Sequence, residues 1–143
     1  MTTRAPRRDA VENRAVILAA ARSTLAVDPY ASIDVIARSA GLSRRTLYGH
    51  FDDRDALIRE LISTGAQRFN AIAASIDDED ARITLARLAA RLWHEAAHVH
   101  LAAALALDET HVEHTAAALA PLRRTVADLV RCGQEDGSFR TDL

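Results

Sequence analysis

The sequence predicts an all-α protein built from a three-helix head with a helix-turn-helix, a long connecting helix and a helical body. Hydrophobic residues make up 49% of the 143 residues, whereas only 5 residues are Gly and 3 are Pro. This composition, rich in Ala and Leu, favours helices over strands and long loops. Apolar residues also recur three and four positions apart along most of the chain, which is the pattern of amphipathic helices.

The first helix is expected over residues 9–25, where one apolar stripe carries Val11, Ala15, Leu18 and Leu25. Pro29 prevents this helix from continuing. Arg14 and Arg22 lie on the same helix, and we expect both to be solvated and not bound to DNA. The helix would then form the base on which two shorter helices pack.

Two short helices joined by a tight turn are expected next. Residues 32–40 place apolar side chains on one face, and Gly41 follows where a positive φ angle would end the helix. Ser43 is a good N-cap for a second helix, and Leu42 can pack on Leu47 as a hydrophobic staple. This layout is a helix-turn-helix, whose second helix enters the major groove of DNA.

The second of these helices has the composition of a DNA-reading element. Leu47 and Phe51 lie four apart and can anchor it to a core, which leaves its polar residues to face outward: Arg44, Arg45, Tyr48 and His50. Arg can pair with guanine, while Tyr, Thr and His can hold phosphates. Ser43 and Thr46 could add hydroxyl and amide donors for a phosphate. The alternative is an ordinary helical hairpin with a solvated basic face.

A long helix should follow from residue 54 to residue 76, capped by the pair Asp52-Asp53. Its apolar residues keep helical spacing throughout, and at 1.5 Å per residue it would span roughly 35 Å. We divide the chain at this point into residues 1–51, a DNA-binding domain, and residues 52–143, a helical body.

The body is expected to hold three further helices after the acidic break at residues 77–80. The helix over 81–107 would bury Leu85, Leu88, Leu92, Ala96 and Val99, with Trp93 widening the buried side. A short helix over 111–120 and a helix from Pro121 onward should follow, the latter closed by Gly137.

Histidines in the body raise the question of a metal. His94, Glu95 and His98 form H-E-x-x-H, the zinc hydrolase motif, for which Glu109, His111 or His114 would have to supply a third ligand. A weaker form of the idea is a metal or polar-ligand sensing site made by the four histidines. Histidines that bind no ligand explain the same spacing, and we expect no metal, no cofactor and no catalytic residue.

The charge is divided unevenly along the chain. Residues 1–51 carry 8 Arg against 4 acidic residues, residues 52–143 carry 10 Arg against 16, and the chain has no Lys. A basic head on an acidic body is expected when only one end meets DNA. The arginines of residues 1–8, including Arg4, form a basic arm that either enters the minor groove or frays in solvent.

Other bulk features fit an intracellular location. No apolar run approaches the roughly 20 residues of a membrane span, and no signal peptide is recognisable. Cys132 is the single cysteine, which excludes an internal disulfide, and we expect it to be a buried structural thiol. The protein is expected to be cytoplasmic, without contact with a membrane.

The stretch Ile36-Ala-Arg-Ser-Ala-Gly-Leu-Ser-Arg-Arg-Thr-Leu-Tyr-Gly-His-Phe51, followed by Asp53-Arg-Asp-Ala-Leu57, resembles the DNA-binding signature of TetR-family transcriptional regulators. The likeness covers about residues 10–62. It implies operator DNA as a partner, with bases read by Arg44, Arg45 and Tyr48, and phosphates held by Thr46, Tyr48, His50 and Arg54. Arg54 stands where the family usually carries Lys, and Gly49 replaces a larger residue that often contacts a base.

The same resemblance implies that residues 52–143 are a shortened domain for ligand binding and dimerisation. It also implies a repressor that leaves DNA when a small apolar effector enters this body and tilts the long helix. Candidate effector-binding residues are Phe69, Leu92, Trp93, His94, Leu101 and Leu105. The alternative is a DNA-binding protein whose body binds another protein and no small ligand. Family members usually continue past residues 132–143 with two more helices that form the dimer interface. We therefore expect a homodimer, with the helix over 121–135 as a candidate interface.

Overall fold

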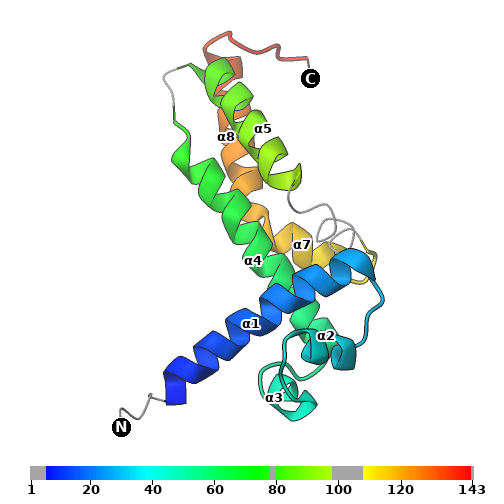
Figure 1. The fold of residues 1–143 in the computed structure, drawn as a ribbon. Helices are drawn as coiled ribbons and strands as arrows, with labels where there is room; N and C mark the ends of the chain where they lie inside the picture. The colour runs from blue at the N-terminus through cyan, green and yellow to red at the C-terminus, as the bar shows by residue number, and fades with distance from the viewer. Residues whose placement is uncertain (1–5, 78–79, 98–107, 143) are drawn as a thin grey trace. The chain divides into compact units, whose positions relative to one another are not determined.

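A computed structural model describes residues 6–77, 80–97 and 108–142. Within these ranges the chain forms helices and no strand, as expected for an all-α protein (Figure 1). The helices are α1 Pro6–Val27, α2 Ile33–Ser39, α3 Arg44–Tyr48, α4 Arg54–Ser75, α5 Ala81–Ala97, α7 Val112–Ala118 and α8 Ala120–Glu135. None of these helices is long and apolar enough to cross a membrane. The chain divides into two compact units, residues 1–61 and 62–143.

In the first unit, α1 is buried only along its C-terminal half. The buried side chains there are Ile17, Leu18, Ala21 and Leu25. The expected stripe was therefore wrong at its start, because Val11 is 69% exposed and Ala15 is exposed as well. The N-terminal half of α1 extends beyond α2 and α3, so these helices leave its apolar side chains in solvent (Figure 1).

The turn between α2 and α3 follows the expected local rules. The Ser32 hydroxyl caps α2 by accepting from the Val35 amide, and Gly41 takes a φ of +67°, a conformation that favours glycine. The Ser43 hydroxyl then accepts from the Thr46 amide at 3.1 Å and caps α3. The sequence-predicted helix-turn-helix is present in this unit.

The long helix α4 begins in the first unit and ends in the second. Its N-terminus is capped by Asp53, whose Oδ1 accepts from the Ala56 amide at 2.7 Å. Leu57, Ile58 and Leu61 are buried and complete the core of the first unit. The helix ends at Ser75, one residue before the expected end.

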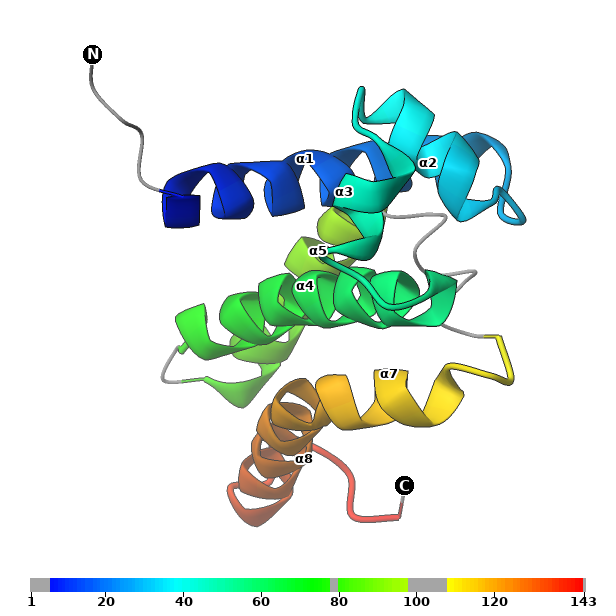
Figure 2. The ribbon, with the colours of Figure 1, turned by 90° about the horizontal axis from the view of Figure 1, so that it is seen from below.

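In the second unit, side chains of α4 hold the junction between α7 and α8. The Asn70 amide group donates to the Ala118 carbonyl at 2.9 Å and accepts from the Leu122 amide at 3.0 Å. Ser63 Oγ and His114 Nε2 lie 3.0 Å apart and link α4 to α7. Figure 2 shows α7 and α8 meeting at an angle, at the point where the sequence places Pro121 in the first turn of α8.

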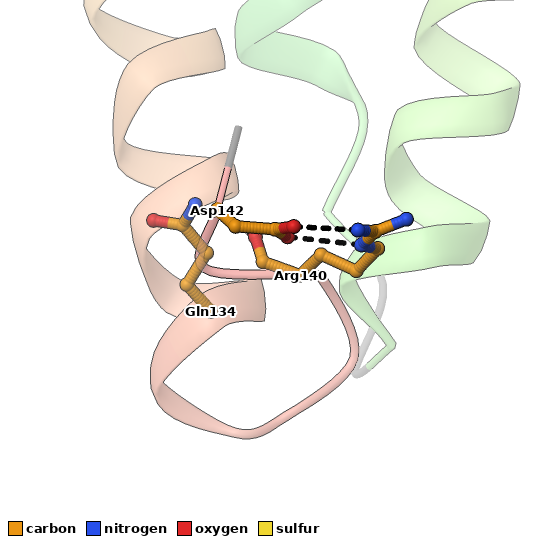
Figure 3. A network of polar contacts seen from close by, with 3 residues as sticks. All are labelled: Gln134, Arg140 and Asp142. Atoms are coloured by element: carbon orange, nitrogen blue, oxygen red, sulfur yellow. Dashed lines mark hydrogen bonds and ion pairs between the residues drawn. The ribbon is translucent and has the colours of Figure 1, made fainter.

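The end of α8 is closed by the residues that follow it. Gly137 has a φ of +79°, and the Phe139 amide donates to the Gly133 carbonyl at 2.7 Å. The Phe139 ring lies so close to Gly133 that a Cβ atom there would be 2.1 Å from Cδ2 of the ring. Figure 3 shows Arg140 paired with Asp142. The Gln134 side-chain amide also donates to the Arg140 carbonyl at 2.9 Å.

Cys132 is exposed, so the expectation of a buried thiol was wrong. On α8 the side chains of Leu122, Val126, Leu129 and Val130 are half-buried, and Gly133 is buried. One residue of a helix advances about 100° around the axis, so Cys132 lies to one side of Gly133 and of the covered face.

Candidate nucleic-acid interface

The helix α3 has one buried side and one open side. Leu47 on α3 and Phe51 just beyond it are almost fully buried, as the four-residue spacing predicts. Ser43, Arg44, Arg45 and Tyr48 are exposed, while Thr46 and His50 are half-buried. The structure therefore brings the sequence-predicted DNA-binding residues of α3 together on one open surface, anchored from behind by two apolar side chains.

Arg44 is held by two neighbours on this surface. Its Nε lies 3.2 Å from Asp34 Oδ1 of α2, and its guanidinium carbon lies 5.4 Å from the centre of the Tyr48 ring. A hydrogen bond with Tyr48 and the charge of Asp34 raise the pKa of Arg44 above its ordinary value. Because the Arg44 and Asp34 side chains are 66% and 47% exposed, solvent weakens their ion pair. A phosphate or a guanine edge could replace Asp34 as the partner.

The other polar side chains at the start of α3 differ in whether they already have a hydrogen-bond partner. The Arg45 side chain is exposed and makes no hydrogen bond or ion pair to the residues that the structure describes. The hydroxyl groups of Ser43 and Thr46 lie 2.8 Å apart, so one of their two hydrogens is already donated. Arg45 is thus the side chain with most freedom to reach a base.

Arg14 is the functional candidate that the sequence reading missed. Its side chain is 40% exposed, but its Nη1 donates to the His50 carbonyl at 3.1 Å and its guanidinium carbon lies 4.4 Å from the centre of the Phe51 ring. The available signal was its position three and four residues before the buried Ile17 and Leu18, on the covered side of α1. Arg22 is exposed, as expected.

Arg54, predicted to hold a phosphate, is half-buried at the start of α4. Its Nε donates to the Ala31 carbonyl at 3.0 Å, and its Nη2 donates to the Pro29 carbonyl at 2.5 Å. Both carbonyls belong to the loop between α1 and α2. A guanidinium has five N–H groups, so these two bonds leave other donors unused.

The effector-binding candidates are only partly brought together. Phe69 and Leu92 are half-buried, but Trp93 is 79% exposed and His94 is exposed. Trp93 and His94 therefore do not line the covered side of α5, which carries Ala81, Thr84 and Leu88. The reason is geometric, since five positions after Leu88 correspond to about 140° around the helix. Leu101 and Leu105 lie outside the described residues.

The histidine motif is described only in part, because His98 falls outside the described residues. The carboxylate of Glu95 lies 3.5 Å from Nη1 of Arg68, and His114 lies on another helix beside Ser63. Within residues 6–77, 80–97 and 108–142, no group of three or more His, Cys, Asp or Glu side chains could hold a metal ion.

Comparisons with known proteins agree with this geometry. Residues 17–61 match the family model described as bacterial regulatory proteins of the tetR family. The fatty acid degradation regulator FadR from Bacillus halodurans has a similar structure, with a TM-score of 0.78 and 21% identity over 99% of this chain and 75% of its own. A putative TetR-family transcriptional regulator from Vibrio parahaemolyticus has a TM-score of 0.70 and 23% identity over 90% and 74% of the two chains. No curated protein sequence matches the chain.

Proposed function

We propose that this chain, whose residues 17–61 match the N-terminal domain of TetR-family regulators, is an operator-specific DNA-binding repressor released by a small effector. The observation that carries the DNA-binding part is the two-sided character of α3. Leu47 and Phe51 fix the helix from behind, and its arginines and Tyr48 face solvent. Such an anchored, basic helix is what major-groove recognition requires.

Within this surface we assign different roles to different side chains. Arg44, Arg45 and Tyr48 read bases, and Ser43, Thr46 and His50 position the head on phosphates. Arg has the donor geometry for guanine, and hydroxyl or imidazole groups suit phosphate oxygens. Base contacts decide sequence preference, whereas phosphate contacts decide register and salt dependence.

The test is selection of bound duplexes from a random DNA pool at near-physiological salt. A recovered palindrome with two half-sites supports a sequence-specific homodimer, because the symmetry of the site mirrors that of the protein. A single half-site supports DNA reading by one head and refutes the dimer. No enrichment refutes sequence-specific binding. Arg45→Ala should erase part of the recovered motif, while the exposed control Arg22→Ala on α1 should leave it intact.

For the effector we propose a small apolar molecule that binds in the second unit. Phe69 of α4 and Leu92 of α5 are half-buried there, and apolar pockets lined by such side chains are the usual small-molecule sites. Calorimetry against a library of apolar compounds, with fatty acids among them because one structural neighbour regulates fatty acid degradation, tests this assignment. A ligand that binds and also releases operator DNA supports it; binding without release contradicts the repressor mechanism.

A second candidate for the body is a surface that binds another protein and no small ligand. Ile83 and Trp93 are 50% and 79% exposed on α5, both about 140° around the helix from the buried Leu88. Exposed apolar side chains on one side of a helix are typical of interaction sites. Failure of the compound library, together with loss of regulation in Trp93→Ala, would favour this candidate.

A further inference from the structure

We propose that Arg14 of α1 is a positioning residue for DNA recognition, which holds the turn after α3 in the place that DNA binding requires. This inference rests on the proposed function, because it concerns how the same α3 surface is held. It assigns to an arginine outside the helix-turn-helix a role in sequence discrimination without a contact to a base.

The guanidinium of Arg14 reaches three groups at once. Its Nη1 donates to the His50 carbonyl at 3.1 Å, its central carbon lies 4.4 Å from the centre of the Phe51 ring, and its Nη2 lies 3.4 Å from Glu60 Oε1. One side chain thus ties α1 to the turn between α3 and α4 and to α4 itself.

The helix α3 depends on such ties because it has only five residues. A helix of this length does not hold its shape or direction by backbone hydrogen bonds alone. The carbonyl group of His50 lies between two helices, where it must find a donor elsewhere, and Arg14 supplies one. The stack on Phe51 adds a contact to the residue that anchors this end of α3 in the core.

The surroundings of Arg14 favour positioning over a direct phosphate contact. The Arg14 guanidinium already forms an ion pair with Glu60. The Arg14 side chain is 40% exposed, whereas that of Arg44 is 66% exposed. A hydrogen bond, a stack and an ion pair made together require the flat, forked guanidinium. A lysine would keep the charge at this position but could not reproduce all three contacts.

The experiment compares wild type with Arg14→Lys, Arg14→Ala and the control Arg22→Ala, which changes an exposed arginine of the same helix. Affinity is measured for the selected operator and for a random duplex over a range of salt concentrations. The temperature is one at which circular dichroism shows every variant folded. Affinity of the folded protein is a readout that a merely structural role for Arg14 would not move.

We expect both Arg14 variants to bind the operator about tenfold more weakly, the factor associated with losing one hydrogen bond to a charged group. Their affinity for the random duplex should change by less than about twofold, and the slope of log affinity against log salt should stay unchanged. Wild-type operator affinity in Arg14→Lys would overturn the inference. The inference would also be overturned if Arg14→Ala lost the same affinity for both duplexes and its salt slope fell by about one, because Arg14 would then hold a phosphate. If wild type binds the operator no more tightly than the random duplex, the proposed function fails. If wild type, Arg22→Ala and the Arg14 variants all prefer the operator to the same degree, only this inference fails.

Discussion

Replacing Arg54 by Ala tests whether this arginine holds the head together or holds DNA. The sequence predicts a phosphate contact, but the guanidinium donates to the carbonyls of Pro29 and Ala31 in the loop before α2. If these bonds are the main role of Arg54, its loss will lower the stability of the first unit. If phosphate binding is the main role, stability will stay and the salt dependence of DNA binding will fall.

The expected magnitude follows from the two hydrogen bonds. Bonds to a charged donor contribute about 1.5–3 kcal/mol each when well shielded, and neutral ones about 1 kcal/mol. Arg54 is half-buried, so water can satisfy part of what the two carbonyls lose, and about 1 kcal/mol per bond is the appropriate value. Arg54→Ala should therefore destabilise the head by about 2 kcal/mol. Arg54→Lys, which can keep one bond, should destabilise it by about 1 kcal/mol.

Thermal unfolding by circular dichroism measures this effect, with fluorescence of the single tryptophan, Trp93, as a separate reporter for the second unit. Arg45→Ala is the matched control, because the Arg45 side chain has no polar partner within the described ranges and its loss should weaken DNA binding without altering stability. The reasoning would be refuted by an Arg54→Ala variant within about 0.5 kcal/mol of wild type, the usual size of a neutral surface change. If the salt slope of Arg54→Ala were also lower by about one, the main role of Arg54 would be a phosphate contact.

Three further substitutions test other parts of the chain. Arg44→Ala should cost about 1–3 kcal/mol on the operator and relax one base preference, as measured by competition with single-base operator variants. Gly133→Ala should displace the Phe139 ring and destabilise the second unit by about 1–3 kcal/mol in urea unfolding, while Phe139→Ala in the same background should remove most of the clash. Hydrogen bonds from Ser138 lower the pKa of Asp136, so its contribution to stability is present above its unfolded pKa of about 3.9 and is lost as pH falls through the lower folded value. Asp136→Asn should flatten the acid side of the curve of unfolding midpoint against pH.

Local rules in the sequence predicted the helix-turn-helix well. Ser43 caps α3, Gly41 has a positive φ, and Leu47 is buried, because caps, turns and apolar spacing depend on neighbouring residues. The start of α4 after Asp53 and the end of α8 before Gly137 followed from the same signals. By contrast, α1 runs from Pro6 to Val27 and exceeds the expected residues 9–25 at both ends.

Side-chain partners distant in sequence could not be predicted in this way. Arg14 meets a carbonyl 36 residues away and Arg54 meets carbonyls 23 and 25 residues away, so only the packed fold brings them together. In the body, helical spacing placed Leu88 correctly but could not say how wide the covered side of α5 is. Trp93 was expected to widen that side, but its position on the helix, about 140° from Leu88, directs it away.

Because the chain has no Lys, its arginines must supply both the contacts within the protein and the contacts with DNA. Guanidinium groups serve equally well as internal braces and as DNA ligands, so counting arginines in the head overestimates its phosphate contacts. Arg14 and Arg54 already have protein partners, and Arg44 must exchange Asp34 before it can reach DNA. Each phosphate contact contributes about 0.9 to the slope of log affinity against log salt. The head should therefore bind with a weaker salt dependence than its basic composition implies, and a larger share of its operator affinity should come from contacts that read sequence.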